Sequence, residues 1–175
     1  MPIIVDTNCF ANVFSRTSAK HKDFQPVLSW VVEGKGLFIY GGTKYKEELK
    51  KAKKYLAIFR FLKEVGKVIN KNDNEIDELQ KEIEAIKEKE LFNDVHLLAI
   101  SAITKCRIIC SEDTTSIQFV TDKKYLPKGV AKPVYYTSIK NKNLLCDKYV
   151  DDSLKPLCKI KKSLADKLYN SLPKN

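Results

Sequence analysis

The 175-residue sequence lacks any apolar run of the roughly 18 residues that a membrane-spanning helix needs. Its first residues also lack a positively charged segment ahead of an apolar stretch, so we expect no secretory signal peptide. No internal repeat or low-complexity linker interrupts the chain. These absences argue against a membrane protein and a repeat array, and they favour a soluble globular protein of the cytoplasm.

The sequence also lacks a zinc-binding cysteine pattern. The cysteines are odd in number, which without export indicates reduced thiols. Cys106 and Cys110 lie four positions apart rather than in a C-x-x-C pair. We therefore expect ordinary buried or surface cysteines at all five positions: Cys9, Cys106, Cys110, Cys146 and Cys158.

What the chain has in excess is positive charge. Its 32 lysines and arginines give a formal net charge of +10, which attracts polyanions, with nucleic acid as the first candidate. A merely solvated lysine-rich surface is the alternative. Residues 44–67 and 121–175 are basic, whereas 72–94 carry nine acids against three lysines. This uneven distribution predicts distinct basic and acidic faces.

Short apolar segments alternate with helical patterns along the chain. The strands are predicted at 3–6, 36–42, 107–113 and 132–139, with a brief further strand at 68–69. Helices are predicted at 24–33, 44–66 and 72–106, the last with a break near Phe92. Strands separated by helices favour an α/β fold with a parallel sheet and helices on its faces.

Acidic residues follow two of these strands directly. Asp6 ends the first strand, and Glu112 and Asp113 end the strand at 107–113. Because the carboxyl ends of parallel strands form the ligand-binding edge of an open sheet, these carboxylates are expected to lie close together. Like charges packed closely need a cation, and oxygen ligands favour Mg²⁺ or Mn²⁺.

Two further acids stand out on the helices. Asp94 interrupts the start of an apolar helix, where an unpartnered carboxylate is costly, and Glu48 lies on the helix after the second strand. Each acid also has a purely structural interpretation. Asp6, or Asp94 together with Asn93, could cap a helix. Asp113 could be a turn residue, and Glu48 could pair with lysines one turn away.

Taken in order, these motifs resemble the PIN-domain ribonucleases, which include the toxins of bacterial toxin–antitoxin pairs. The resemblance implies a three-layer α/β/α fold over residues 1–140, with a central, mostly parallel sheet of four to five short strands. Residues 49–91 would be an enlarged charged helical segment. Residues 141–175, without a counterpart, would be a lysine-rich helical extension with a break at Pro156. The segments that carry the resemblance are IIVDTNCF at 3–10, TKYKEEL at 43–49, FNDVHLLAISA at 92–102 and IICSED at 108–113.

The family's site residues can be carried over position by position. The metal-binding, catalytic acids implied by the resemblance are Asp6, Glu48, Asp94 and Asp113. Supporting positions are implied at Thr7, Asn8, Asn93 and Ser111. Glu47 and Glu112 are alternates, because each lies next to an implied ligand.

The activity implied is that of a metal-dependent endoribonuclease, with Mg²⁺ or Mn²⁺ as cofactor and single-stranded or structured RNA as substrate. A toxin or defence effector would have this activity, and a protein antitoxin or inhibitor and a second copy of the chain are the further partners considered. The lysines expected to hold the phosphate backbone are Lys44, Lys46, Lys50, Lys51, Lys53 and Lys54.

The aromatic and histidine side chains near these motifs are weaker candidates for RNA binding or catalysis. Tyr45, Tyr55 and Phe59 could stack on bases, although the last two are expected in the core. His96 follows Asp94 by two positions, so on a helix it would point roughly 160° away from that residue. We therefore expect His96 to pack or to lie on the surface.

Three rival interpretations stay open. The fold could be a catalytically inactive PIN-like RNA-binding module, or the nuclease could act on DNA. A receiver domain also gathers acids and Mg²⁺ at strand ends. That class requires a paired acid near the first strand, where this chain has only Asp6, so it ranks last.

Overall fold

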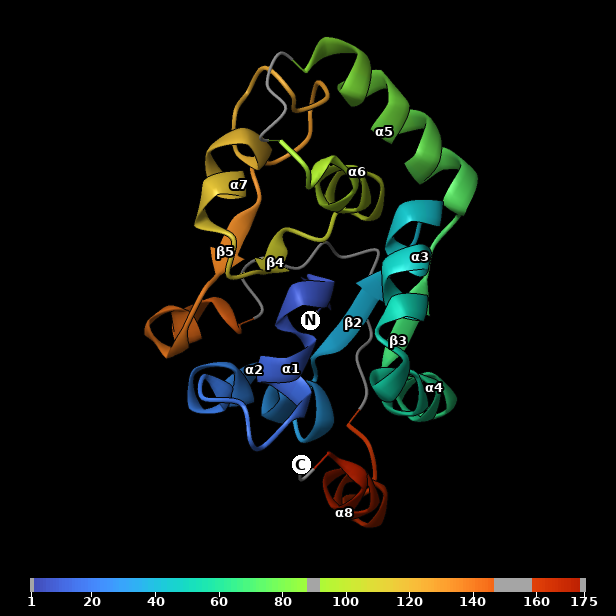
Figure 1. Cartoon of the computed structure of the whole chain (residues 1–175), viewed down its shortest axis with the longest axis vertical. Coiled ribbons are helices and arrows are strands. Elements are labelled where there is room, and N and C mark those ends of the chain that lie inside the picture. Colours follow the sequence, from blue (N-terminus) through green and yellow to red (C-terminus); the bar gives the residue numbers. More distant parts are fainter. Residues whose placement is uncertain (1, 88–91, 147–158, 174–175) are drawn as a thin grey trace.

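A five-stranded sheet lies at the centre of the structure, a computed structural model that describes residues 2–87, 92–146 and 159–173 (Figure 1). The strand order is β3-β2-β1-β4-β5 and every neighbouring pair is parallel. This confirms the predicted α/β class, the parallel sheet and the brief strand at 68–69. The strands are β1 (Pro2–Val5), β2 (Leu37–Tyr40), β3 (Val68–Asn70), β4 (Ile108–Cys110) and β5 (Val134–Tyr136).

Helices cover both faces of the sheet. Figure 1 shows α5, α6 and α7 on one side and α1, α2 and α4 on the other, which is compatible with the expected three layers. The α-helices are α1 (Phe10–Phe14), α2 (His21–Val32), α3 (Thr43–Lys51), α4 (Leu56–Glu64), α5 (Asp73–Ile86), α6 (Val95–Thr104), α7 (Thr114–Val120) and α8 (Lys162–Ser171). Short 3₁₀ turns are η1 (Thr7–Cys9), η2 (Lys53–Tyr55) and η3 (Ile139–Leu144).

The single helix predicted at 44–66 is wrong, because the chain turns at Ala52. This residue has φ −81° and ψ 47°, outside the helical region, and ends α3. The turn allows the Tyr55 and Phe59 rings to pack against Phe10, with ring centroids 5.9 and 5.1 Å away. Burial of these rings against α1 offsets the loss of a continuous helix.

The strand order creates a switch point between β1 and β4. The chain moves outward from β1 through β2 to β3, then crosses back to place β4 and β5 on the other side of β1. Val5 lies opposite Cys110 in this pair, so the residues that follow, Asp6 and Ser111, emerge side by side. Ligands of open parallel sheets bind at such a switch point.

Helix α6 is almost entirely apolar and buried, as its composition predicts. It contacts β1 and β4 on one side and α5 on the other, and residues 95–101 are all buried. The predicted break before it is confirmed, because α5 ends at Ile86 and α6 begins at Val95. Since α6 starts at the carboxyl edge of the sheet, its first residues lie near the switch point.

A close approach between α5 and the start of α3 requires glycine at position 42. Gly42 has a φ of +80°, and a Cβ added there would lie 2.8 Å from Ile76 Cγ2. Its N–H donates to Asp73 Oδ1 at 2.9 Å, and Thr43 donates to Asp77. The acids of α5 therefore satisfy the N-terminus of α3, which holds that helix along the carboxyl edge.

Helix α8, in the predicted C-terminal extension, packs onto the rest of the molecule. Ala165, Leu168 and Leu172 are buried, α8 contacts α4, and Arg16 donates to the Tyr169 carbonyl at 3.1 Å. The boundary expected at residue 140 falls inside η3, and the break predicted at Pro156 lies outside the described residues. Among the described residues, no helix is long and apolar enough to cross a membrane.

Candidate functional site

Asp6 is buried at the end of β1, with 4% of its surface exposed. Ser111 Oγ donates to its Oδ2 at 2.8 Å, and the Asn8 N–H donates to its Oδ1 at 3.2 Å, which also caps η1. Burial, and then the negative charge of Asp94, raise the pKa of Asp6 to about 6. The two hydrogen bonds lower this pKa but do not outweigh the rise. Asp6 is therefore held rigidly in a place where its own charge is unfavourable.

Asp94 lies at the start of α6, but its side chain does not cap that helix. Its Oδ2 is buried and has no hydrogen-bond partner among the described residues. Burial raises the pKa of Asp94, the Ser116 hydroxyl and His96 oppose the rise, and Asp113 adds to it. A buried carboxylate oxygen without a donor is rare in folded proteins and is characteristic of a ligand site.

Glu48, rather than Glu47, turns toward this edge of the sheet. Thr7 Oγ1 donates to Glu48 Oε2 at 3.0 Å, and His96 Nε2 lies 3.4 Å from the same oxygen. Burial would raise the pKa of Glu48, but His96 and Thr7 outweigh it, so the pKa lies below its usual value. Glu47 is exposed and lines a groove between α3 and α5.

The acids after β4 have structural partners. Asp113 Oδ1 accepts from the Thr115 N–H at 2.8 Å and the Ser116 N–H at 3.2 Å, so Asp113 caps α7. The Thr115 hydroxyl, foremost, lowers the pKa of Asp113. The alternate Glu112 turns away to an ion pair with Lys20 at 2.5 Å. Asp113 is near enough to influence Asp94, but only its second oxygen is left for a cation.

The supporting residues act differently from the expectation. The Thr7 hydroxyl donates a hydrogen bond to Glu48 instead of Asp6. Asn8 donates its backbone N–H to Asp6, and its side chain is exposed. Asn93 is also exposed, and its carbonyl accepts a hydrogen bond from Lys44 Nζ at 2.7 Å. Ser111 alone does what the resemblance implies, because its hydroxyl fixes Asp6.

His96 is buried, which is the packing alternative of the two expected, but its ring does not point away from the acids. The ring is 2% exposed and faces Glu48, and its charge also influences Asp6 and Asp94. The helical angle did not apply because Asp94 precedes the helix, with φ −94° and ψ 29°. A polar residue in the first turn of an otherwise apolar helix was the signal that could have revealed it.

Tyr135, at the centre of β5, is a second residue that the sequence reasoning missed. Its hydroxyl is buried without a hydrogen-bond partner among the described residues. Burial raises the pKa of Tyr135, and Asp94, Asp6 and Asp113 raise it further. Tyr135 therefore lies in the electrostatic surroundings of the acids. A tyrosine in the middle of a short strand is no local motif, so no signal in the sequence pointed to it.

The lysines expected to bind nucleic acid divide into two groups. The first group is engaged within the protein: Lys44 donates a hydrogen bond to the Asn93 carbonyl, and Lys46 forms an ion pair with Asp73. Tyr45 is buried and donates to the Val5 carbonyl at 2.5 Å, so its expected stacking on bases is wrong. The exposed lysines are at the end of α3 and in η2: Lys50, Lys51, Lys53 and Lys54.

The acids do not form a preassembled metal site. Within residues 2–87, 92–146 and 159–173, no group of three or more His, Cys, Asp or Glu side chains is arranged to hold a metal ion. Their chemistry nevertheless fits a divalent cation, because Asp94 Oδ2 lacks a hydrogen-bond partner among the described residues and the negative charge of Asp94 adds to the cost of ionising the buried Asp6. Rotation of these side chains would be needed to share an ion.

No protein-family model, curated protein or solved structure matches this chain. The resemblance to the PIN-domain ribonucleases therefore consists of the four short segments described above. What the chain does has to be inferred from the site.

Proposed function

We propose that this chain is a metal-dependent nuclease that cleaves RNA, an endoribonuclease of the PIN type. The observation that carries the proposal is the pair formed by Asp6 and Asp94. The buried Asp6 and the half-buried Asp94 come from different elements at the switch point of a parallel sheet, and burial, followed by the negative charge of Asp94, raises the pKa of Asp6. Such an arrangement costs stability and is expected where carboxylates serve a function.

Asp6, Asp94 and Glu48 would hold the ion, with Asp113 contributing its remaining oxygen. A bound Mg²⁺ or Mn²⁺ would lower the pKa of a water molecule and stabilise negative charge on the scissile phosphate. Ser111 and the Asn8 N–H orient Asp6, and Thr7 orients Glu48. These bonds hold Asp6 and Glu48 at the carboxyl edge, from which a rotation of the side chains would bring them onto a shared ion.

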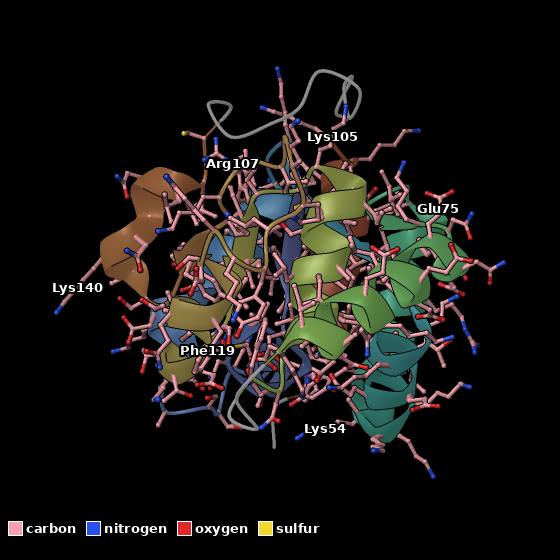
Figure 2. The ribbon with its side chains drawn as sticks, turned by 90° about the horizontal axis from the view of Figure 1, so that it is seen from above. Lys54, Glu75, Lys105, Arg107, Phe119 and Lys140 are labelled. Carbon is pink, nitrogen blue, oxygen red and sulfur yellow. The ribbon has the colours of Figure 1, made fainter. Side chains whose placement is uncertain are left out.

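The exposed lysines at the end of α3 would bind the phosphate backbone. Lys54 lies at the opposite edge of the molecule from Lys105 and Arg107 (Figure 2). Lys105 ends α6 and Arg107 precedes β4, so that edge contains the amino ends of the strands. The basic segment around Lys54 therefore belongs to the carboxyl edge, where the acids are. RNA held there by phosphate contacts would pass the candidate site.

Cleavage of labelled RNA and DNA with Mg²⁺, Mn²⁺ or EDTA tests the proposal. Asp6→Asn and Asp94→Asn are expected to slow cleavage by about two orders of magnitude or more. Asp166→Asn is the matched control, because Asp166 is exposed on α8. Cleavage that persists in EDTA, or in Asp6→Asn, would refute a metal-dependent mechanism at this site.

An inactive RNA-binding module is the second candidate. The observation that favours it is the absence of a preassembled three-residue metal group in the described part of the chain. This candidate predicts that RNA is bound, with salt-sensitive affinity, and never cut. Cleavage of DNA but not RNA would instead change the substrate and keep the mechanism.

The biological setting follows from the resemblance. We propose a toxin or defence effector acting in the cytoplasm, with an antitoxin or inhibitor protein as its partner. Expression of the wild-type chain should then arrest growth, whereas expression of Asp6→Asn should not. Equal toxicity of the two chains would contradict this setting.

A further inference from the structure

His96 is buried without any satisfied ring nitrogen. Its side chain is 3% exposed, and neither Nδ1 nor Nε2 has a hydrogen-bond partner among the described residues. Imidazole nitrogens in a protein interior are normally paired, because an unpaired buried polar atom forfeits its bonds to water. Glu48 Oε2, 3.4 Å from Nε2, approaches the ring without completing a hydrogen bond, and Nδ1 has no partner among the described residues.

The surroundings of His96 are those of a cation site. Glu48 Oε2 lies 3.4 Å from Nε2, and that oxygen is fixed by the Thr7 hydroxyl. The ring also belongs to the electrostatic surroundings of Asp6 and Asp94. The Tyr45 ring lies on α3 with its centroid 6.3 Å from that of His96. The imidazole thus contacts Glu48 and lies within electrostatic range of Asp6 and Asp94.

The spacing between His96 and Glu48 suits two ligands of one ion. Donors that each lie about 2.1 Å from a metal are separated by roughly 3.0 to 3.4 Å at ordinary coordination angles. A hydrogen bond between the same atoms would be shorter, at about 2.7 to 3.2 Å. The observed 3.4 Å lies at the upper end of the first range and beyond the second.

We infer that His96 supplies a nitrogen ligand to the divalent cation, beside Glu48 and the Asp6 and Asp94 carboxylates, and that the site selects Mn²⁺ over Mg²⁺. The inference rests on the proposed function, since it concerns the same site. Mg²⁺ prefers oxygen ligands and keeps much of its water, whereas imidazole binds first-row transition metals. A mixed nitrogen and oxygen set therefore discriminates between the two ions.

Pulsed electron paramagnetic resonance of the Mn²⁺-loaded full chain, without a polyhistidine tag, tests the ligand directly. A coordinated imidazole couples its nitrogen to the metal, and ¹⁵N-labelled histidine changes that coupling. The chain has two histidines, so one matched control suffices. His96→Gln should lose the coupling, and His21→Gln should keep it, because His21 bonds the Asn12 carbonyl instead.

The metal preference is measured by competition between Mn²⁺ and Mg²⁺ for the same chain. His96→Gln should weaken Mn²⁺ binding by about 10- to 100-fold, with a smaller loss for Mg²⁺. Circular dichroism shows whether the variant folds, and if it does not, coupling that persists in His21→Gln still assigns the ligand to His96.

The outcomes separate the two proposals. Mn²⁺ binding that depends on Asp6 but shows no histidine coupling overturns the role of His96 and leaves the nuclease site intact. Histidine coupling that survives His96→Gln overturns it as well. Failure of any divalent ion to bind overturns both.

Discussion

The charge of Asp6 should lower the stability of the folded protein at neutral pH. Its folded-state pKa of about 6 lies above the ordinary value of 3.8, chiefly because the group is buried. A raised pKa contributes stability that is fully present below pH 3.8 and is lost as the pH rises through 6. The difference corresponds to about 3 kcal/mol between acidic and neutral pH.

Replacement of Asp6 by asparagine removes this charge and keeps the shape. The amide oxygen can still accept from Ser111 or from the Asn8 N–H, and loss of the other bond costs about 1 kcal/mol. We therefore expect Asp6→Asn to gain about 2 kcal/mol at pH 7.5. For a domain of this size, that gain raises the Tm by about 4 to 8 °C.

Thermal unfolding in EDTA, followed by circular dichroism between pH 4 and 8, measures the effect. The gain should shrink as the pH falls from 7.5 toward 4, because the wild-type carboxyl then binds its proton in the folded state. Asp166→Asn should match the wild type throughout. The reasoning would be refuted by a variant that is no more stable than the wild type at pH 7.5, or by a difference that is the same at every pH.

Three further changes have defined outcomes. Ser111→Ala leaves Asp6 Oδ2 without its donor, so the free energy of unfolding in urea at pH 7.5 should fall by about 1 kcal/mol. The pKa of Asp6 should rise for the same reason. Tyr45→Phe removes the hydrogen bond to the Val5 carbonyl and should cost about 1 kcal/mol in the same assay, with an unchanged fold. Leu168→Ala in α8 should cost about 2 to 5 kcal/mol, and a smaller loss would show that α8 is an appendage.

The positions of the strands, and their alternation with helices, could be predicted from the sequence. Each strand is a short apolar run ended by glycine or by a polar residue, and these are local features. The helical stretch after β2 was not readable in this way. Composition favours a helix on both sides of Ala52, and only the packing of Tyr55 and Phe59 against Phe10 favours a turn there.

The sequence by itself determined that acids would lie at the carboxyl edge, because in a parallel sheet Asp6 follows an apolar strand there, and Asp94 directly precedes a buried helix that packs on that strand. Which acids face the centre was decided by tertiary structure alone. Glu112 pairs with Lys20, a residue 92 positions away, and His96 contacts Glu48, which lies on another helix. Side-chain direction and the supply of distant partners depend on packing, and no local pattern encodes them.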